Sequence, residues 1–215
     1  MKKFTGEYFD IEYFKPGIKS NYAQEYTWQN EKAKVEHKAA ALRDKLNPHK
    51  VLDIGCAKGF MVRALCELKI DAWGVDISQY AIDNAEPDYK QRLKVCDIRD
   101  EALPFSPASF DAIYCDNVLE HVEDEYVDFV LSEISRVLKP LGTAVLQLPV
   151  GLGLVNKPVG EASHVNYSAP AYWISKAWKF YLNTDLRRSM HASYGHQGAY
   201  QNLILILVKG RLKNE

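Results

Sequence analysis

The chain has 215 residues, a formal net charge of -1 and a composition that is 47% hydrophobic and 26% charged. These values are typical of a globular protein with a sizeable core. They disfavour extended disorder, and also a nucleic-acid partner, which requires a strong basic excess. No uninterrupted apolar stretch approaches the roughly 20 residues of a membrane-spanning helix. We therefore expect one domain over residues 1–215 that is cytoplasmic and has no contact with a membrane.

Residues 1–46 combine an aromatic lead, EYFDIEYFKPGIKSNYAQEYTW, with a helix expected around NEKAKVEHKAAALRDKL. Val35, Ala39 and Leu42 recur at helical spacing, which gives that helix one apolar face. The aromatic side chains of the lead fit two roles: they pack the helix onto the rest of the protein, or they fold over a binding site as a lid. We expect a mixture of the two.

Residues 50–149 alternate short β-branched runs with longer segments whose apolar residues recur every three or four positions. This alternation predicts an α/β fold with a doubly wound, mainly parallel Rossmann-like sheet and helices on both faces. The expected strands are residues 50–54, 72–77, 93–98, 110–116 and 143–149.

Residues 150–215 begin with a loop rich in Gly, Pro and small polar residues, VGLGLVNKPVGEASHVNYSAP. Loops of this length in compact domains are commonly functional, so we expect a substrate loop here. A helix, APAYWISKAWKFYL, follows it. The runs MHASYG and YQNLILILVKG then suggest an antiparallel pair that turns around Gly195 to Gly198. The sheet would then have seven strands, with this last pair closing one edge and with an antiparallel last strand.

The stretch VLDIGCAKGF, residues 51–60, places Gly55 and Gly59 after the first strand, where a ligand can approach bare backbone. Its spacing matches neither the P-loop nor the GxGxxG dinucleotide fingerprint. Acids end the first three strands at Asp53, Asp76 and Asp97, and the ends of parallel strands share one rim. Such a rim repels pyrophosphate and favours a cationic molecule that carries a ribose.

These segments together resemble the motifs of the class I S-adenosylmethionine-dependent methyltransferases, of the small-molecule type with an LEH sequence. VLDIGCAKGF resembles the first motif, GVDIS the ribose-binding acid, and CDIRDEALPF the third motif. FDAIYCDNVLEHV and ISRVLKPLGTAVLQLP resemble the fourth and fifth, so the match runs in order from about residue 50 to 149. The resemblance implies S-adenosyl-L-methionine as cofactor and S-adenosyl-L-homocysteine as product.

By this resemblance, the loop with Gly55 and Gly59 surrounds the methionine part, Asp53 lies near its amino group and Asp76 binds the ribose hydroxyls. Asp97 and Ile98 would meet the adenine, although Asp53 and Asp97 also fit a simpler role as helix caps. The resemblance further implies that the lead covers the cofactor. The full set expected to bind the cofactor is Asp53, Gly55, Cys56, Gly59, Asp76, Ile77, Asp97, Ile98, Asn117, Tyr22 and Tyr26.

Methyl transfer needs a base only where the acceptor must lose a proton. The candidate catalytic residues are His121, in NVLEH, and His164, in the long loop. A histidine that locks a helix start and an ordinary surface histidine are the respective alternatives, and Glu120 and Glu161 are further candidate bases. The pair Asp116 and Asn117 offers only one acid and one amide, so no metal site is expected.

The leading hypothesis is transfer of a methyl group to a hydroxyl of a small molecule such as a sugar, a polyketide or a phenolic intermediate. Nitrogen or carbon acceptors are the nearest alternatives. Methylation of a protein or RNA is a further alternative, although the chain lacks the Asn/Asp-Pro-Pro-Tyr tetrapeptide of enzymes that act on adenine or glutamine amines. A protein that binds the cofactor without catalysis is the alternative from another class. We expect a monomer or a homodimer.

Overall fold

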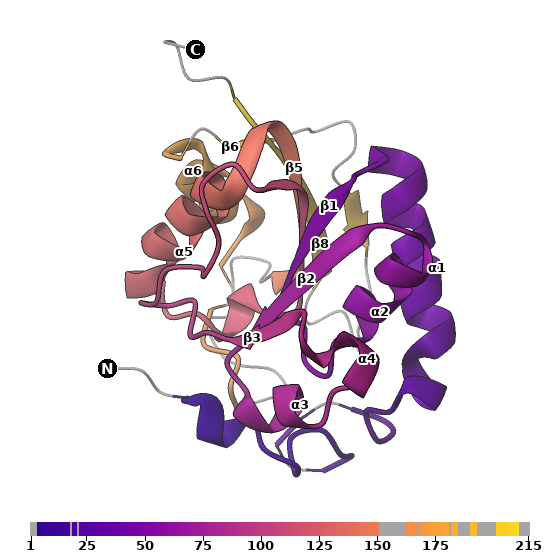
Figure 1. Cartoon of the computed structure of the whole chain (residues 1–215). Coiled ribbons are helices and arrows are strands. Elements are labelled where there is room, and N and C mark those ends of the chain that lie inside the picture. Colours follow the sequence, from indigo (N-terminus) through magenta and orange to yellow (C-terminus); the bar gives the residue numbers. More distant parts are fainter. Residues whose placement is uncertain are drawn as a thin grey trace.

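A twisted mixed sheet occupies the centre of the molecule, and helices cover both of its faces (Figure 1). The computed structural model describes residues 4–17, 19–20, 22–150, 162–166, 168–180, 182–184, 190–192 and 201–210. Within them the strands are β1 (Lys50–Ile54), β2 (Asp71–Asp76), β3 (Leu93–Val95), β4 (Phe110–Asp116), β5 (Leu138–Val150), β6 (Leu182–Thr184), β7 (Met190–Ala192) and β8 (Gln201–Lys209).

The strand order is β3-β2-β1-β4-β5-β8-β6, and β7 also pairs with β8. β1 to β5 are parallel to one another, whereas β8 runs antiparallel to β5, β6 and β7. The predicted fold class, a doubly wound and mostly parallel sheet with antiparallel strands at the end, is confirmed. The predicted turn around Gly195 to Gly198 lies outside the described residues.

Three elements differ from the sequence-based expectation by three residues or more at one end. β3 ends at Val95, and β5 begins at Leu138, directly after the preceding helix. The helix expected over APAYWISKAWKFYL ends at Trp178, and residues 182–184 of the following segment form the unexpected strand β6. β6 has only three residues and pairs with β8 alone. A run this short has no apolar pattern that predicts a strand.

The helices connect the strands and flank the sheet. They are the short 3-10 helix η1 (Gly6–Tyr8), α1 (Trp28–Leu46), α2 (Phe60–Glu67), α3 (Gln79–Asp83), α4 (Pro87–Lys90), the 3-10 helix η2 (Leu119–His121), α5 (Asp124–Val137) and α6 (Pro170–Trp178). α1 begins where the Thr27 side chain accepts a hydrogen bond from the Asn30 amide, as helix caps do. No described helix is long and apolar enough to cross a bilayer.

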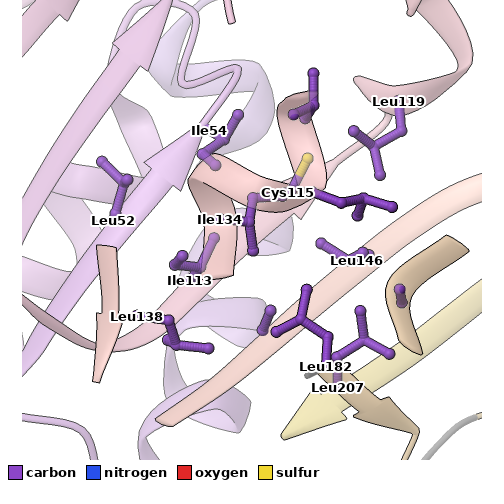
Figure 2. Close-up of a cluster of buried hydrophobic side chains, with 14 of the residues drawn as sticks. Leu52, Ile54, Ile113, Cys115, Leu119, Ile134, Leu138, Leu146, Leu182 and Leu207 are labelled. Carbon is purple, nitrogen blue, oxygen red and sulfur yellow. The ribbon is translucent and has the colours of Figure 1, made fainter. Parts of the chain in front are cut away.

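Two apolar layers hold these helices on opposite faces of the sheet. On β4, Ile113 and Cys115 point into the layer beneath α5 and α6, which Figure 2 shows, and Ala112 and Tyr114 point into the layer beneath α1 and α2. This alternation follows from the two-residue repeat of a strand. Both layers fix the strand ends, and therefore everything that the strands carry at their carboxyl edge.

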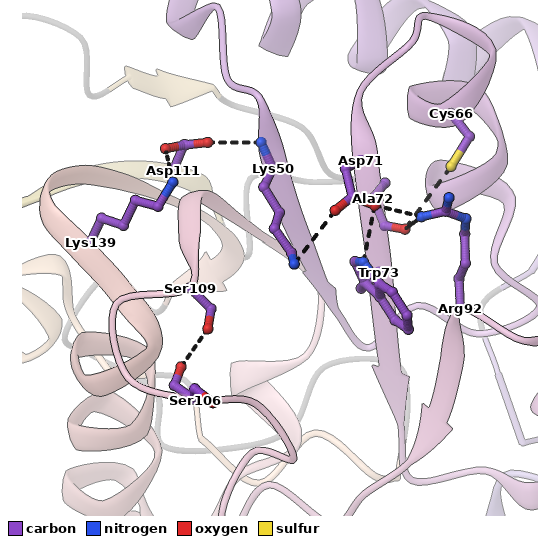
Figure 3. Close-up of polar contacts among 10 residues, drawn as sticks. All are labelled: Lys50, Cys66, Asp71, Ala72, Trp73, Arg92, Ser106, Ser109, Asp111 and Lys139. Carbon is purple, nitrogen blue, oxygen red and sulfur yellow. Dashed lines mark hydrogen bonds and ion pairs between the residues drawn. The ribbon is translucent and has the colours of Figure 1, made fainter.

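A polar network ties the strands together at the opposite, amino edge of the sheet (Figure 3). Asp111 accepts hydrogen bonds from the Lys50 amide at 2.8 Å and from Lys139 Nζ at 2.7 Å. Asp71 binds Arg92 Nη1 at 2.6 Å and lies 3.5 Å from Lys50 Nζ. Both acids form ion pairs at the surface.

Candidate functional site

A cavity of about 450 Å³ lies at the carboxyl edge of the parallel strands. Open parallel sheets bind ligands at this edge because the loops after several strands meet there. The lining contains all predicted site residues except Gly59, namely Asp53, Gly55, Cys56, Asp76, Ile77, Asp97, Ile98, Asn117, Tyr22, Tyr26, His121 and His164. The structure therefore brings residues from Phe4 to His164 to one space.

The loop after β1 turns sharply at Gly55. Its φ angle is +75°, and a Cβ at this position would clash with the side chain of Val118. The amides of Gly55 and Cys56 both donate to the Val75 carbonyl, at 2.8 and 3.0 Å, which anchors the loop on β2. A residue without a side chain is required here, and it leaves bare backbone at the cavity wall.

Gly59, the second glycine of this loop, has a structural role in the turn. It does not line the cavity, and its amide closes the turn by donating to the Cys56 carbonyl at 2.8 Å. Its φ angle is +77°, and a Cβ there would lie 2.7 Å from the Leu93 side chain. The conformation and the packing of the turn explain this glycine without a ligand contact.

Asp76, at the end of β2, is held rigidly by backbone amides. Its Oδ2 accepts from the Ala57 amide at 2.7 Å and its Oδ1 from the Ser78 amide at 2.8 Å. Burial raises the pKa of this carboxyl, and the amide hydrogen bonds oppose that rise. Because a carboxylate has about four acceptor positions, Asp76 retains capacity for hydroxyl donors from the cavity.

Asp53 is 4% exposed and lies among other acids. Burial, followed by the negative charges of Asp116 and Asp76, raises its pKa well above the usual range. Asp116 itself pairs with Lys38 from α1 and accepts a hydrogen bond from the Tyr114 hydroxyl at 3.0 Å. This side of the cavity therefore favours cationic groups over phosphate.

Asp97 is bound by a residue that the sequence analysis does not predict. Arg99, 4% exposed, donates from Nε to Oδ1 and from Nη2 to Oδ2 of Asp97, both at 2.8 Å. Arg99 lines the cavity and also lies 3.4 Å from Glu123. Bidentate Arg–carboxylate geometry of this kind orients the acid firmly. The motif CDIRD contains the pair, but its spacing alone does not reveal the contact.

The aromatic lead runs along the cavity edge and lines it with Phe9 and Phe14 as well as Tyr22 and Tyr26. Three contacts fix it there. Gly6 packs against the Ile77 carbonyl so closely that a Cβ would overlap with it, the Ser78 hydroxyl donates to the Phe9 carbonyl, and Lys58 Nζ donates to the Tyr26 carbonyl at 3.0 Å.

Tyr26 has both of the roles considered for the lead. It lines the cavity, and its ring also stacks on Phe60 of α2 with the centroids 4.8 Å apart. Trp28, in contrast, packs edge-on against Phe60 and lies in the apolar layer between α1 and α2. The aromatic residues are thus divided between the cavity wall and the core.

His121 and His164 meet at one end of the cavity with their ring centroids 4.8 Å apart. The Nδ1 of His121 donates to the Ser163 carbonyl at 3.1 Å, and the Nε2 of His164 lies 3.9 Å from Oε1 of the buried Glu120. Burial, followed by the nearby His164, lowers the pKa of His121 to about 3. Glu161, the other candidate base, lies outside the described residues.

Comparison with known proteins agrees with this geometry. Residues 52–146 match the family described as methyltransferase domain. A ubiquinone biosynthesis O-methyltransferase of Methylococcus capsulatus is 37% identical over 146 residues, which are 66% of this chain and 54% of that protein. The mitochondrial protein of the same name from Schizosaccharomyces pombe is 36% identical over 103 residues, 45% of this chain and 36% of that protein. The chain thus spans about half or less of these relatives.

Solved structures show the same fold. A putative sarcosine dimethylglycine methyltransferase from Galdieria sulphuraria superposes with a TM-score of 0.67 at 14% identity, covering 86% of this chain and 88% of that one. A geranyl diphosphate C-methyltransferase from Streptomyces coelicolor gives a TM-score of 0.63 at 18% identity, covering 80% and 77%. At these identities the likeness concerns the fold alone.

Proposed function

We propose that this chain, whose residues 52–146 form a class I S-adenosylmethionine-dependent methyltransferase domain, transfers a methyl group to a hydroxyl oxygen of a small-molecule acceptor. One observation carries the proposal. Gly55 and Asp76, the residues expected to hold the cofactor, line the same cavity as His121 and His164. A cofactor and an acceptor can therefore meet in one space. The relatives named O-methyltransferases support oxygen as the acceptor atom.

The residues of the cavity fit the cofactor. Asp53 and Asp76 are acids at the rim, and they suit a molecule with an ammonium group, a sulfonium and ribose hydroxyls. Gly55 presents bare backbone at the cavity wall, where Val118 leaves no room for a Cβ. S-adenosylmethionine supplies an electrophilic methyl group on its sulfonium when it is bound. We propose Asp76 as the ribose ligand, Asp53 as a partner of the amino group, and Asp97 with Ile98 at the adenine.

The chain contributes mainly by orientation and by exclusion of water. Methyl transfer is an in-line displacement, and holding the acceptor oxygen in line with the methyl group can supply several kcal/mol, up to about 7–11 in model reactions. The lead places Phe9, Phe14 and Tyr22 along the cavity, and these walls limit access of water. We propose that residues 4–27 act as a lid and that their aromatic walls suit a flat, phenolic acceptor.

An acceptor hydroxyl must lose its proton during the transfer. His121, His164 and Glu120 are the groups at the acceptor end that can assist this loss. Assistance of this kind contributes typically 10²- to 10⁴-fold to the rate. Amines that are neutral at the working pH need less assistance, so the cluster favours oxygen over nitrogen as the acceptor. A single domain over residues 1–215 and a monomeric or homodimeric state remain predictions.

The test is a product assay with the purified chain, methyl-labelled S-adenosylmethionine and matched acceptors: a catechol, a sugar, a phenethylamine and a buffer blank. We expect labelled methyl ether from the catechol and an equal amount of S-adenosylhomocysteine. Transfer to the amine alone would contradict oxygen as the acceptor atom. Binding of the cofactor without transfer to any acceptor in a broad panel would contradict the enzymatic role and leave a cofactor-binding protein.

A further inference from the structure

Three side chains with metal-binding atoms gather at the acceptor end of the cavity. One carboxylate oxygen of Glu120, one ring nitrogen of His121 and one of His164 all lie within 4.8 Å of one another. We propose that these three residues bind a divalent transition-metal ion, with Zn²⁺ as the reference ion, and that the ion holds the acceptor oxygen. The role of the ion rests on the proposed function, whereas its binding does not.

The chemistry of the ligands suits such an ion. Two imidazoles and one carboxylate form a set that binds Zn²⁺ and related metals with positions left open for substrate. Bonds of about 2.0–2.2 Å place neighbouring ligand atoms about 3–3.5 Å apart. The Nε2 of His164 lies 3.9 Å from Oε1 of Glu120, so a movement of about 0.4–0.9 Å closes this pair around an ion, and any wider separation in the cluster is at most 4.8 Å.

The backbone already positions the ligands. Because a carbonyl oxygen only accepts, the contact of His121 Nδ1 with the Ser163 carbonyl at 3.1 Å places the ring proton on Nδ1. That tautomer leaves the Nε2 lone pair for a metal, which is the usual arrangement of metal-bound histidine. The ring orientation is therefore set by a residue next to the other histidine ligand.

The segment that carries His164 is clamped onto η2, which carries the other two ligands. The amides of Val165 and Asn166 both donate to the backbone carbonyl of Glu120, at 2.8 and 3.0 Å. The Asn166 side chain also donates to the Val122 carbonyl at 3.3 Å. Two segments more than 40 residues apart are thus joined by three hydrogen bonds around the cluster. Such support is typical of sites whose geometry must be preset.

Charge also favours a cation here. The side chain of Glu120 is 0% exposed, and a neighbouring positive charge stabilises a buried carboxylate. A divalent ion between Glu120 and the imidazoles would provide it. A protonated His164 is the competing source of positive charge, since it lies at ion-pair distance from Glu120. A bound ion gives a protein that contains metal, whereas a protonated His164 gives one that does not, so a measurement of metal content distinguishes them.

The earlier candidate pair, Asp116 and Asn117, is not part of this cluster. Asp116 is already paired with Lys38 and hydrogen-bonded to Tyr114. An ion at the histidine cluster would instead face the acceptor. A metal lowers the pKa of a bound water from 15.7 to about 7, and it acts on a bound acceptor hydroxyl in the same sense.

The experiment begins with the full chain stripped by a chelator and dialysed. Zn²⁺ is titrated calorimetrically, bound metal is measured by mass spectrometry, and Co²⁺ is added separately to record its visible spectrum. We expect one ion per chain in the cavity site and a Co²⁺ spectrum of nitrogen and oxygen coordination. The variants His121→Ala, His164→Ala and Glu120→Gln should each weaken binding at least tenfold. The exposed His37 and His49 lie elsewhere, so His37→Ala and His49→Ala are matched controls that should bind normally.

Two results would overturn the inference: a folded wild-type chain that binds neither ion, or binding that His121→Ala and His164→Ala leave intact. Circular dichroism identifies variants that do not fold, and the wild-type titration still decides the question if they fail. Titration of S-adenosylhomocysteine into the stripped chain separates this inference from the proposed function. We expect its affinity to change less than about twofold when metal is removed.

Discussion

The backbone of Gly55 and the side chain of Val118 are in direct contact, so that no Cβ fits between them. Gly55 follows β1 and Val118 follows β4, and the contact therefore joins the loops of two adjacent strands at the floor of the cavity. The shape of the cavity wall at this point therefore requires a glycine at position 55.

The first prediction concerns this contact. Gly55→Ala should destabilise the fold by about 2–4 kcal/mol, because the left-handed backbone costs about 1–2 kcal/mol for a residue with Cβ and the overlap with Val118 adds a similar amount. The affinity for the cofactor should also fall, because Gly55 lines the cavity. Chemical denaturation and calorimetry measure the two effects. Gly17→Ala is the control, since nothing lies within 4 Å of a Cβ there, and its unfolding free energy should change by less than about 0.5 kcal/mol. Equal stability of both variants would refute the packing argument.

The second prediction concerns the lid. Gly6→Ala should displace the lead from β2, because the new methyl group would overlap with the Ile77 carbonyl. The two apolar layers do not include the lead before Tyr26, but Phe14 of the lead packs in a smaller cluster with Ala57 and Ala81. The melting temperature should therefore fall modestly while the Kd for S-adenosylhomocysteine rises severalfold. Calorimetry with thermal melting measures both quantities. An unchanged Kd would show that the lead does not cover the cofactor.

The third prediction concerns pH. Because the folded state raises the pKa of Asp53, it holds that proton more tightly than the unfolded chain does. The free energy of unfolding contributed by this group is therefore fully present below the unfolded value, near pH 4, and is lost as the pH rises toward the raised folded value.

Asp53→Asn removes the pH-dependent fall in unfolding free energy, because an asparagine side chain does not ionise. The unfolding free energy of this variant should exceed that of the wild type only slightly near pH 4 and by more at pH 7, and the melting temperature should rise in the same sense. Cofactor affinity should fall, since a charged partner of the amino group is absent. Denaturation curves at several pH values test this, and a stability difference that does not change with pH would contradict the assigned cause.

The fold was largely predictable from sequence, for a physical reason. The strands buried on both faces leave apolar runs such as VLDI and FDAIYC, and α1 buries Val35 and Leu42 at helical spacing. These signals are local. β6 was missed because three residues form a strand only through their pairing with β8.

The site was predictable where motifs place residues at strand ends, as for Asp53 and Asp76. It was not predictable where contacts depend on the three-dimensional arrangement. Lys38 reaches Asp116 across 78 positions of sequence, and the contact of His164 with Glu120 depends on a loop that folds back. At Gly59 the motif predicts a contact with the cofactor. The structure adds a packing reason for a glycine at this position, because a Cβ there would overlap with Leu93.

The most direct test of the central claim is calorimetric titration of S-adenosylmethionine and S-adenosylhomocysteine into the wild type, Asp76→Ala and Asp71→Ala. Asp71 is the first residue of β2 and Asp76 the last. Asp71 forms exposed ion pairs with Lys50 and Arg92 and a hydrogen bond with Trp73 at the amino edge of the sheet, so it is a matched control. We predict saturable binding of one ligand per chain, at least about tenfold weaker binding in Asp76→Ala, and no change in Asp71→Ala. Absence of binding to the folded wild type, or equal binding by Asp76→Ala, would contradict the account.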